Sequence, residues 1–175
     1  MTDFKNIDYL SIGNERQRQA YRELIDLNIF NLLKEFNPIL AGTIPIEIDL
    51  PESDLDIICE CKDHSEFSKV LTTHFSEKDG FEIKLYDRNG IETTLVRFNT
   101  RSFVIEIFGQ NIPTHKQNAY RHMLIENKIL NQKGAEFRSR VIALKSSGLK
   151  TEPAFAKLLG LKGDPYDELL RIKID

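Results

Sequence analysis

The sequence lacks two features that define large classes of proteins, a long apolar run and an excess of basic residues. A helix that crosses a membrane needs about 20 consecutive apolar residues, and no stretch of this chain approaches that length. The first ten residues, MTDFKNIDYL, also lack the basic and then apolar pattern of a secretory signal peptide. We therefore expect no membrane partner and a cytoplasmic location.

The charge balance is slightly acidic, with 24 lysine and arginine residues against 27 aspartate and glutamate residues and a net charge of −3. Proteins that hold nucleic acid depend on many contacts between basic residues and phosphates. We expect no extended nucleic-acid surface, although a local basic cluster could still hold a small anionic ligand. Nothing in the sequence decides the oligomeric state.

Cysteine is scarce as well, and the two cysteines, Cys59 and Cys61, stand two residues apart in a predicted strand. Side chains at that spacing share one face of a strand, and neighbours so placed rarely form a disulfide. Together with His64 they match the residue pattern of a zinc-binding motif only poorly. We expect buried free thiols, because cysteine is among the most buried residue types.

The first part of the chain predicts a helix, strands and a second helix. The three-and-four spacing of apolar residues after Asn14 indicates one long helix, which Asn37-Pro38 ends. The segments ILAG, IPIEID and LDIICE are then expected to form strands. Asp63 with Glu66 resembles the capping box that opens a helix.

The rest of the chain predicts a strand meander followed by helices. FEIKLY, ETTLVRF and FVIEIFG indicate antiparallel strands, and Asp87-Arg88-Asn89-Gly90 is a strong hairpin turn signal. After Pro113 the sequence becomes helical, with a break near Gly134. Thr151 and Asp164 are typical helix N-caps, and Gly160 is expected to close the helix between them.

These elements predict an α+β protein, in which helices pack against a mixed or antiparallel sheet. The apolar fraction of 41% and the charged fraction of 29% are those of a globular protein. We expect one domain over residues 1–175, with a sheet-containing core at about 1–110 and a helical C-terminal subdomain at about 111–175.

Two carboxylates, Asp54 and Asp56, stand at the head of the LDIICE strand, which otherwise has a buried pattern. Side chains alternate along a strand, so the two acids point to the same face. Like charges there repel unless they are exposed, hydrogen-bonded or neutralised by a cation. Two interpretations stay open: Ser53-Asp54 caps the strand entry at the surface, or the pair binds a metal ion.

Glu106 supplies a third carboxylate. It lies inside FVIEIFG, with apolar residues on both sides, and shares a strand face with Val104 and Phe108. If this strand neighbours LDIICE, three oxygen-bearing groups converge, which is a ligand set for Mg²⁺ beside substrate phosphates. Exposure of Glu106 on an edge strand is the alternative.

Gly42-Thr43, followed by Ser53-Asp54-Leu55-Asp56, resembles the signature of the DNA polymerase β-like nucleotidyltransferase superfamily. In that signature a Gly-Ser at a strand end precedes Asp-x-Asp on the next strand, and a third acid follows later. The whole chain is similar to a family of small uncharacterised bacterial proteins of that superfamily, domain of unknown function 4269. The features that carry this resemblance are RQAY, GTIPI, SDLDI, QNAYRHM and KTEPAFAKLLGLKGDPY.

The resemblance implies a nucleotidyltransferase-like fold and a Mg²⁺-dependent transfer of a nucleotidyl group from a nucleoside triphosphate to an unknown small-molecule or protein acceptor. The nucleotide phosphates would lie beside Gly42, Thr43 and Ser53. The catalytic and metal-binding set would be Asp54, Asp56 and Glu106. Of these, Glu106 could also take the proton from an acceptor hydroxyl.

The segment between the two halves of the signature, IPIEIDLPES, is acidic and contains no basic residue. Its acids are Glu47, Asp49 and Glu52. Such a segment repels a triphosphate unless other charges compensate. The basic residues that could compensate are Lys84, Arg97, Arg101, Lys116 and Arg121.

The segment GQNIPTHKQNAYRHM follows the Glu106 strand directly, and loops beyond strand ends often carry ligand sites. Gln117 and Arg121 are four residues apart, as are Asn118 and His122, so each pair would share a helix face. These four residues are candidates for substrate binding. The alternative is that they form the polar first turn of an ordinary helix.

Three functions remain distinct hypotheses. The leading one is a Mg²⁺-dependent nucleotidyltransferase. The same fold could serve a catalytically inactive binding or regulatory protein, because fold does not imply function. It could also serve an antitoxin-like partner of a helical toxin.

Overall fold

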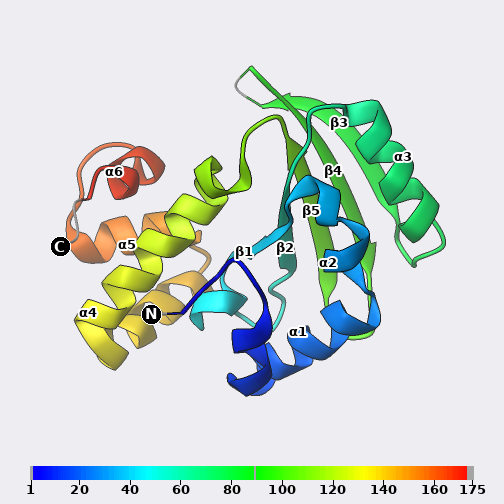
Figure 1. Ribbon diagram of the computed structural model, residues 1–175. Helices are drawn as coiled ribbons and strands as arrows, with labels where there is room; N and C mark the ends of the chain where they lie inside the picture. The colour runs from blue at the N-terminus through cyan, green and yellow to red at the C-terminus, as the bar shows by residue number, and fades with distance from the viewer. Residues whose placement is uncertain (1, 89, 173–175) are drawn as a thin grey trace.

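A five-stranded mixed sheet lies at the centre of the protein, whose computed structural model describes residues 2–88 and 90–172 (Figure 1). The strands are β1 (Ile39–Ala41), β2 (Leu55–Glu60), β3 (Glu82–Arg88), β4 (Ile91–Asn99) and β5 (Val104–Gln110). Their order in the sheet is β1-β2-β5-β4-β3. β2 and β5 run parallel, and the other neighbouring strands run antiparallel. The predicted α+β class with a mixed sheet is confirmed.

Helices cover both faces of this sheet. They are α1 (Glu15–Asp26), α2 (Ile29–Leu32), α3 (His64–Phe75), α4 (Asn118–Ser146), α5 (Thr151–Leu159) and α6 (Pro165–Arg171). Short 3₁₀ turns are η1 (Asp8–Ile12), η2 (Lys34–Phe36), η3 (Ile44–Ile46) and η4 (Thr114–Lys116). Figure 1 shows α1, α2 and α3 on one side of the sheet and α4, α5 and α6 on the other. None of the described helices combines the length and the apolar character that a membrane crossing requires.

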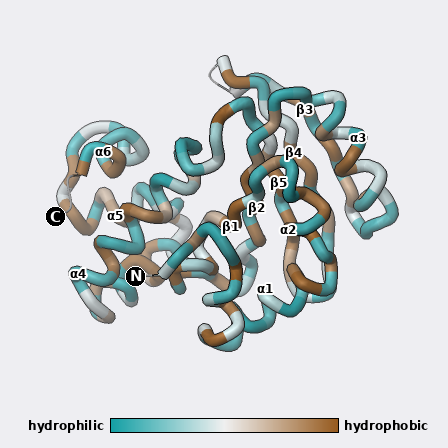
Figure 2. Tube along the Cα trace, in the orientation of Figure 1, coloured by the Kyte–Doolittle hydropathy of each residue, from teal (hydrophilic) through white to brown (hydrophobic). Residues whose placement is uncertain are grey.

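The alternation of side chains along β2 and β5 supplies two hydrophobic cores. Ile57 and Ile107 are fully buried and belong to the core beneath α1, α2 and α3. Ile58 and Phe108 belong to the core beneath α4 and α5. In Figure 2 the hydrophobic segments gather along β2 and β5, between the two groups of helices. This alternation leaves Asp56 and Glu106 on the face that α4, α5 and α6 cover.

The first helix is shorter than predicted. Asn14 caps α1 as expected, in a capping box with Gln17. The helix ends at Asp26, because Asn28 adopts a left-handed backbone conformation with φ of 52°, which asparagine tolerates better than most residues. The apolar spacing continues through this break into α2, which is why the spacing alone indicated one helix.

The strand predicted for IPIEID is wrong. Ile44–Ile46 form η3 instead, and Glu47 ends it with a left-handed backbone. The isoleucines at positions 44, 46 and 48 are each no more than 2% exposed. Their alternation therefore reflects burial of a folded-back loop on two cores and does not reflect pairing in a sheet.

The other local predictions are mostly confirmed. Asp63 caps α3 and Asp164 caps α6, while Gly160 closes α5 with a left-handed conformation. Gly134 breaks α4 as expected, with φ of 78°. Thr151 is the first residue of α5 and not its cap, because Lys150 takes the N-cap position.

Two further predictions concern the hairpin turn and the thiols. The strands β3 and β4 meet at the predicted turn, where the Gly90 N–H donates to Asp87 Oδ1 over 2.8 Å. Asn89, which belongs to the same turn signal, lies outside the described residues. Cys59 and Cys61 are buried free thiols, as expected.

Candidate metal and nucleotide site

The parallel pairing of β2 with β5 brings the three predicted acids together. The register places Asp56 opposite Glu106, and Asp54 immediately precedes β2. One carboxylate oxygen from each of the three residues lies within 4.8 Å of the others. β5 is the central strand of the sheet, so the interpretation of Glu106 as an edge-strand residue is wrong. All three residues are half-buried, so Asp54 is not fully exposed at the entry to its strand.

Burial and mutual repulsion shift the protonation of these acids. Burial, followed by the charges of Asp54, Glu106 and Glu152, raises the pKa of Asp56 to about 7. The pKa of Glu106 is also raised, mainly by burial and then by the charge of Asp54, while Arg97 opposes the shift. The three acids thus lie close together with too little opposite charge, a condition that a divalent cation relieves.

Arg97 is the basic residue that the sheet places against this group. The β4–β5 register pairs Arg97 with Glu106, and its Nη1 lies 3.7 Å from Glu106 Oε1. The arginine side chain is 52% exposed, so its guanidinium can also reach a second anion. Lys84, in contrast, pairs with Glu82 on the exposed side of β3.

Gly42 lies directly after β1 and against Asp56. It has φ of +83°, and a β-carbon at this position would stand 2.4 Å from Asp56 Oδ2. The contact is fixed because Ala41, the preceding residue, pairs with Asp56 across β1 and β2. Glycine is needed here both for the backbone conformation and for the close approach.

Two hydroxyl groups accompany Gly42 at this end of the site. Thr43 Oγ1 lies 3.5 Å from Ser53 Oγ, which joins the two halves of the sequence signature. Ser53 Oγ also accepts a hydrogen bond of 2.9 Å from the Leu50 N–H, so it stabilises the turn that leads into β2.

Basic residues from the helices pair with the acidic segment between Thr43 and Ser53. Arg138 donates to the carbonyl of Glu47 and lies 3.8 Å from its carboxylate. Arg16 lies 3.9 Å from the Asp49 carboxylate. This segment is therefore held against α1 and α4, and the repulsion expected of it is partly neutralised.

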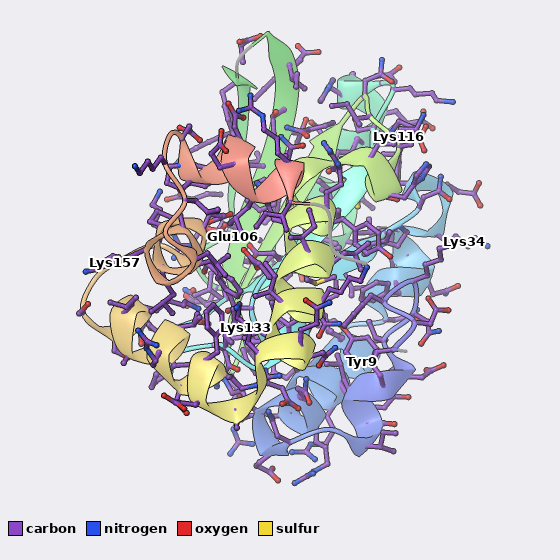
Figure 3. The ribbon with its side chains drawn as sticks, turned by 90° about the vertical axis from the view of Figure 1, so that its left-hand side faces the viewer. Tyr9, Lys34, Glu106, Lys116, Lys133 and Lys157 are labelled. Carbon is purple, nitrogen blue, oxygen red and sulfur yellow. The ribbon has the colours of Figure 1, made fainter. Side chains whose placement is uncertain are left out.

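A cleft of about 770 Å³ lies between one part of the sheet and the C-terminal helices. Gly42, Thr43 and Asp56 line its sheet wall. Residues of η4, α4, α5 and the start of α6 line the opposite surface, which we call the helical wall. Figure 3 views the molecule from the helical side, with α4, α5 and α6 in front and Glu106 on the sheet behind them.

The four residues predicted to bind substrate occupy different positions. Asn118 and His122 line the cleft, whereas Arg121 is exposed and donates to Asn118 Oδ1 over 3.0 Å. Gln117 also lines the cleft but is only 3% exposed. Its side-chain amide donates to the carbonyls of Cys59 and Ile112, each over 2.9 Å, and so ties the start of α4 to β2.

His122 is held between the C-terminal helices. Its Nε2 lies 2.9 Å from the carbonyl oxygen of Tyr166, and its Nδ1 lies 3.6 Å from Glu152 Oε1. The residue is 6% exposed, so it joins α4 to α5 and α6 at the surface of the cleft. Both ring nitrogens thus have neighbours within the protein.

The helical wall contains three acids that the sequence analysis did not single out, Glu126, Glu152 and Asp167. Glu126 is 4% exposed and follows Met123 and precedes Ile129 on the buried stripe of α4. A carboxylate inside such a stripe is the signal that could have revealed it. Glu152 lies in the first turn of α5, where an acidic residue is common. The sequence pattern around it therefore gives no indication that it lines a cleft.

Comparison with protein families gives one match over most of the chain. The model of the family described as Domain of unknown function (DUF4269) matches residues 22–172. No curated protein matches the sequence.

Several solved structures are similar in fold. The structure of the GLD-2/RNP-8 complex aligns with a TM-score of 0.58 and 12% identity, over 87% of this chain and 60% of that chain. The Cid1 structure with the UTP analog UMPNPP aligns with a TM-score of 0.53 and 18% identity, over 76% of this chain and 40% of that chain. The structure of a Cid1 poly(U) polymerase mutant bound to MgATP aligns with a TM-score of 0.55 and 16% identity, over 90% of this chain and 49% of that chain. The chain thus spans about half the length of these proteins, and identities this low show the fold alone.

Proposed function

The chain belongs to the DUF4269 family and has the fold of the DNA polymerase β-like nucleotidyltransferases, and we propose that it transfers a nucleotidyl group from a nucleoside triphosphate to a small-molecule or protein acceptor. The observation that carries this proposal is the pairing of Asp56 with Glu106 beside Asp54, with one oxygen of each within 4.8 Å of the others. Three clustered carboxylates on a central pair of strands have little use in packing, because each loses hydration there.

The donor set of these residues fits Mg²⁺. Hard divalent cations take carboxylate oxygens and usually bind beside substrate phosphates. Asp54, Asp56 and Glu106 would hold the ion, and its positive charge would offset the repulsion that raises the pKa of Asp56. When bound, Mg²⁺ supplies charge stabilisation for the attacking and leaving oxygens of a phosphoryl group.

We assign the triphosphate to the end of the cleft beside Gly42. Gly42 and Thr43 line this end of the cleft, and the hydroxyls of Thr43 and Ser53 offer hydrogen-bonding groups there. Arg97, half-exposed beside Glu106, supplies positive charge on the other side of the acids. Lys116 lines the same cleft from η4.

The reaction is an in-line displacement at the α-phosphorus. An acceptor hydroxyl oxygen forms the new bond, the bond from the α-phosphorus to the bridging oxygen breaks, and pyrophosphate leaves with the electron pair. Glu106 takes the hydroxyl proton in this proposal, because its carboxylate lies with Asp54 and Asp56 where the acceptor hydroxyl would meet the α-phosphorus.

We propose that the two parts of the chain divide these tasks. The sheet-containing core, at about 1–110, carries the acids and the phosphate end of the cleft. The helical C-terminal subdomain, at about 111–175, forms the opposite wall, from which Asn118 and His122 face the substrate. Gln117 positions the start of α4, and Arg121 positions Asn118.

Nucleotide binding tests this proposal. Each of the four common nucleoside triphosphates is titrated into the protein with and without Mg²⁺, followed by mass spectrometry of metabolites and proteins incubated with the bound nucleotide. Asp54→Asn should abolish the Mg²⁺-dependent binding, whereas Glu77→Gln, an exposed acid beyond α3, should leave it unchanged. Binding that is independent of Mg²⁺ and of Asp54 would instead favour the catalytically inactive binding protein.

A further inference from the structure

The helical wall of the cleft is acidic. It carries Glu126 on α4, Glu152 at the start of α5, and Asp164 and Asp167 at the start of α6. Among the lining residues that the structure describes, Lys116 is the only lysine or arginine. This wall therefore attracts a triphosphate only weakly, and its charge favours a positively charged ligand group.

Two of these acids have ordinary structural partners. Asp164 Oδ1 accepts hydrogen bonds from the backbone N–H groups of Tyr166 and Asp167, so Asp164 serves as the cap of α6. Glu152 Oε1 lies 3.6 Å from the Nδ1 of His122. Capping and a histidine contact are sufficient reasons for acids at these positions.

Glu126 lacks such a reason. Its Oε1 is buried and has no hydrogen-bond partner among residues 2–88 and 90–172, and the residue lines the cleft. Burial, followed by the charge of Glu152, raises the pKa of Glu126 to about 8, while the charge of Lys145 opposes this. The Lys145 ammonium donates to the carbonyl of Ile48 and makes no hydrogen bond to the orphan oxygen. A buried acceptor without a donor is uncommon, and it indicates a missing ligand group.

Glu152 links this acid to the reaction site. Glu152 lines the same cleft as Asp56 on the sheet wall and Glu126 on the helical wall. A positive ligand group in this cleft would therefore lie near acids from both walls and relieve the repulsion between them.

We propose that Glu126 and Glu152 bind an ammonium group of the acceptor, so that the acceptor is a small molecule with at least one ammonium group and one hydroxyl. This inference rests on the proposed nucleotidyl transfer and names its acceptor class. The ammonium pairs with the side chains of Glu126 and Glu152 where they line the cleft, and the hydroxyl reaches the α-phosphorus at the acid group.

The two ends of the cleft then bind opposite charges. The triphosphate lies at Gly42 with the metal ion, and the acceptor lies against the helical wall. In the transfer, the acceptor hydroxyl gains the nucleotidyl group and loses its proton to Glu106, pyrophosphate leaves, and the ammonium group keeps its charge. Electrostatic attraction to the wall would also weaken as salt concentration rises.

A matched pair of small probes tests the ammonium site without any nucleotide. 1,3-Diaminopropan-2-ol carries two ammonium groups and a hydroxyl, and glycerol is its uncharged counterpart of nearly the same shape. Calorimetric or NMR titration of the whole protein at low salt should give at least tenfold tighter binding of the diamine. Glu126→Gln should remove most of this preference, and Glu152→Gln, a change at a half-buried position, should reduce it independently. Glu77→Gln, far from the cleft, is the control.

The outcomes separate this inference from the proposed function. Equal binding of the diamine and glycerol, or a preference that both Glu126→Gln and Glu152→Gln leave intact, overturns the acceptor class. If Mg²⁺-dependent nucleotide binding is found in parallel, nucleotidyl transfer still stands. A diamine preference that depends on Glu126, in a protein that binds no nucleotide, confirms the ammonium site and overturns its role as acceptor site.

Discussion

The α-carbon of Gly42 lies so close to the Asp56 carboxylate that a β-carbon added to Gly42 would stand 2.4 Å from Asp56 Oδ2. The glycine also has φ of +83°, a conformation that side chains with a β-carbon rarely adopt. The proposed phosphate end of the site and the proposed metal-binding acids therefore meet at one contact between the end of β1 and β2.

Gly42→Ala should harm both stability and metal binding. The positive φ alone costs about 1 kcal/mol, and the clash with Asp56 should add a comparable amount and displace the carboxylate. Gly160→Ala is the matched control, because Gly160 has φ of +69° with open space around it. Chemical denaturation and Mg²⁺ titration of both variants check this. Equal losses in the two variants, with metal binding intact, would show that the Asp56 contact is unimportant.

Arg97→Gln should change the binding of metal and of nucleotide in opposite directions at pH 8. The guanidinium lies 3.7 Å from Glu106 Oε1 and competes with a cation for that acid, so its loss should strengthen binding of Mg²⁺ alone by about two- to fivefold. The same loss removes attraction for a triphosphate and should weaken Mg²⁺-nucleotide binding by a similar factor. Lys69→Gln, an exposed change on α3, provides the comparison in both titrations. Weakening of both kinds of binding would rule out the proposed competition.

Glu126→Gln should stabilise the protein increasingly as pH rises. The pKa of Glu126 is raised from an ordinary value of 4.5 to about 8, so between these values the unfolded chain is ionised while the folded chain still holds the proton. Folding therefore loses stability as pH rises through this window, by about 1 to 3 kcal/mol, and the glutamine variant escapes that loss. Urea denaturation of both proteins at pH 5, 6.5 and 8 measures the difference. A difference that is constant with pH, or that shrinks, contradicts the assignment.

Gln117→Ala should reduce stability and leave Mg²⁺ binding unchanged. The buried amide of Gln117 donates to the carbonyls of Cys59 and Ile112, and its loss leaves two buried acceptors unsatisfied. We expect the free energy of unfolding to fall by about 1 to 3 kcal/mol. Asn118→Ala, an exposed position, should change stability by less than about 0.5 kcal/mol. If Gln117→Ala is as stable as the wild type, the hydrogen bonds of Gln117 between α4 and β2 do not stabilise this part of the fold.

Local signals in the sequence were sufficient for much of the fold. The caps Asn14, Asp63 and Asp164 act through hydrogen bonds within three residues, so they can be recognised without knowledge of the tertiary structure. The alternation of side chains likewise assigned Asp54 and Asp56 to one face of their strand, and Glu106 to the same strand face as Val104 and Phe108. These features depend only on neighbours in the chain.

The pairing of distant strands and the burial of distant segments could not be predicted from such local signals. Nothing local in the sequence places Glu106 beside Asp56, because the parallel register of β2 and β5 is set by the whole sheet, and only the family resemblance pointed to it. The loop at Ile44–Ile46 has the alternation of a strand because it is buried against two cores. The orphan oxygen of Glu126 exists only once α4 packs over the sheet.

The most direct test of nucleotidyl transfer at this site is calorimetric titration of nucleoside triphosphates into the wild type and Asp56→Asn, each with and without Mg²⁺. The side-by-side placement of Asp56 and Glu106 predicts that at least one triphosphate binds the wild type in the presence of Mg²⁺ and that Asp56→Asn weakens this binding by at least tenfold. Identical isotherms for the two proteins, or binding to neither in the presence of Mg²⁺, would contradict the account.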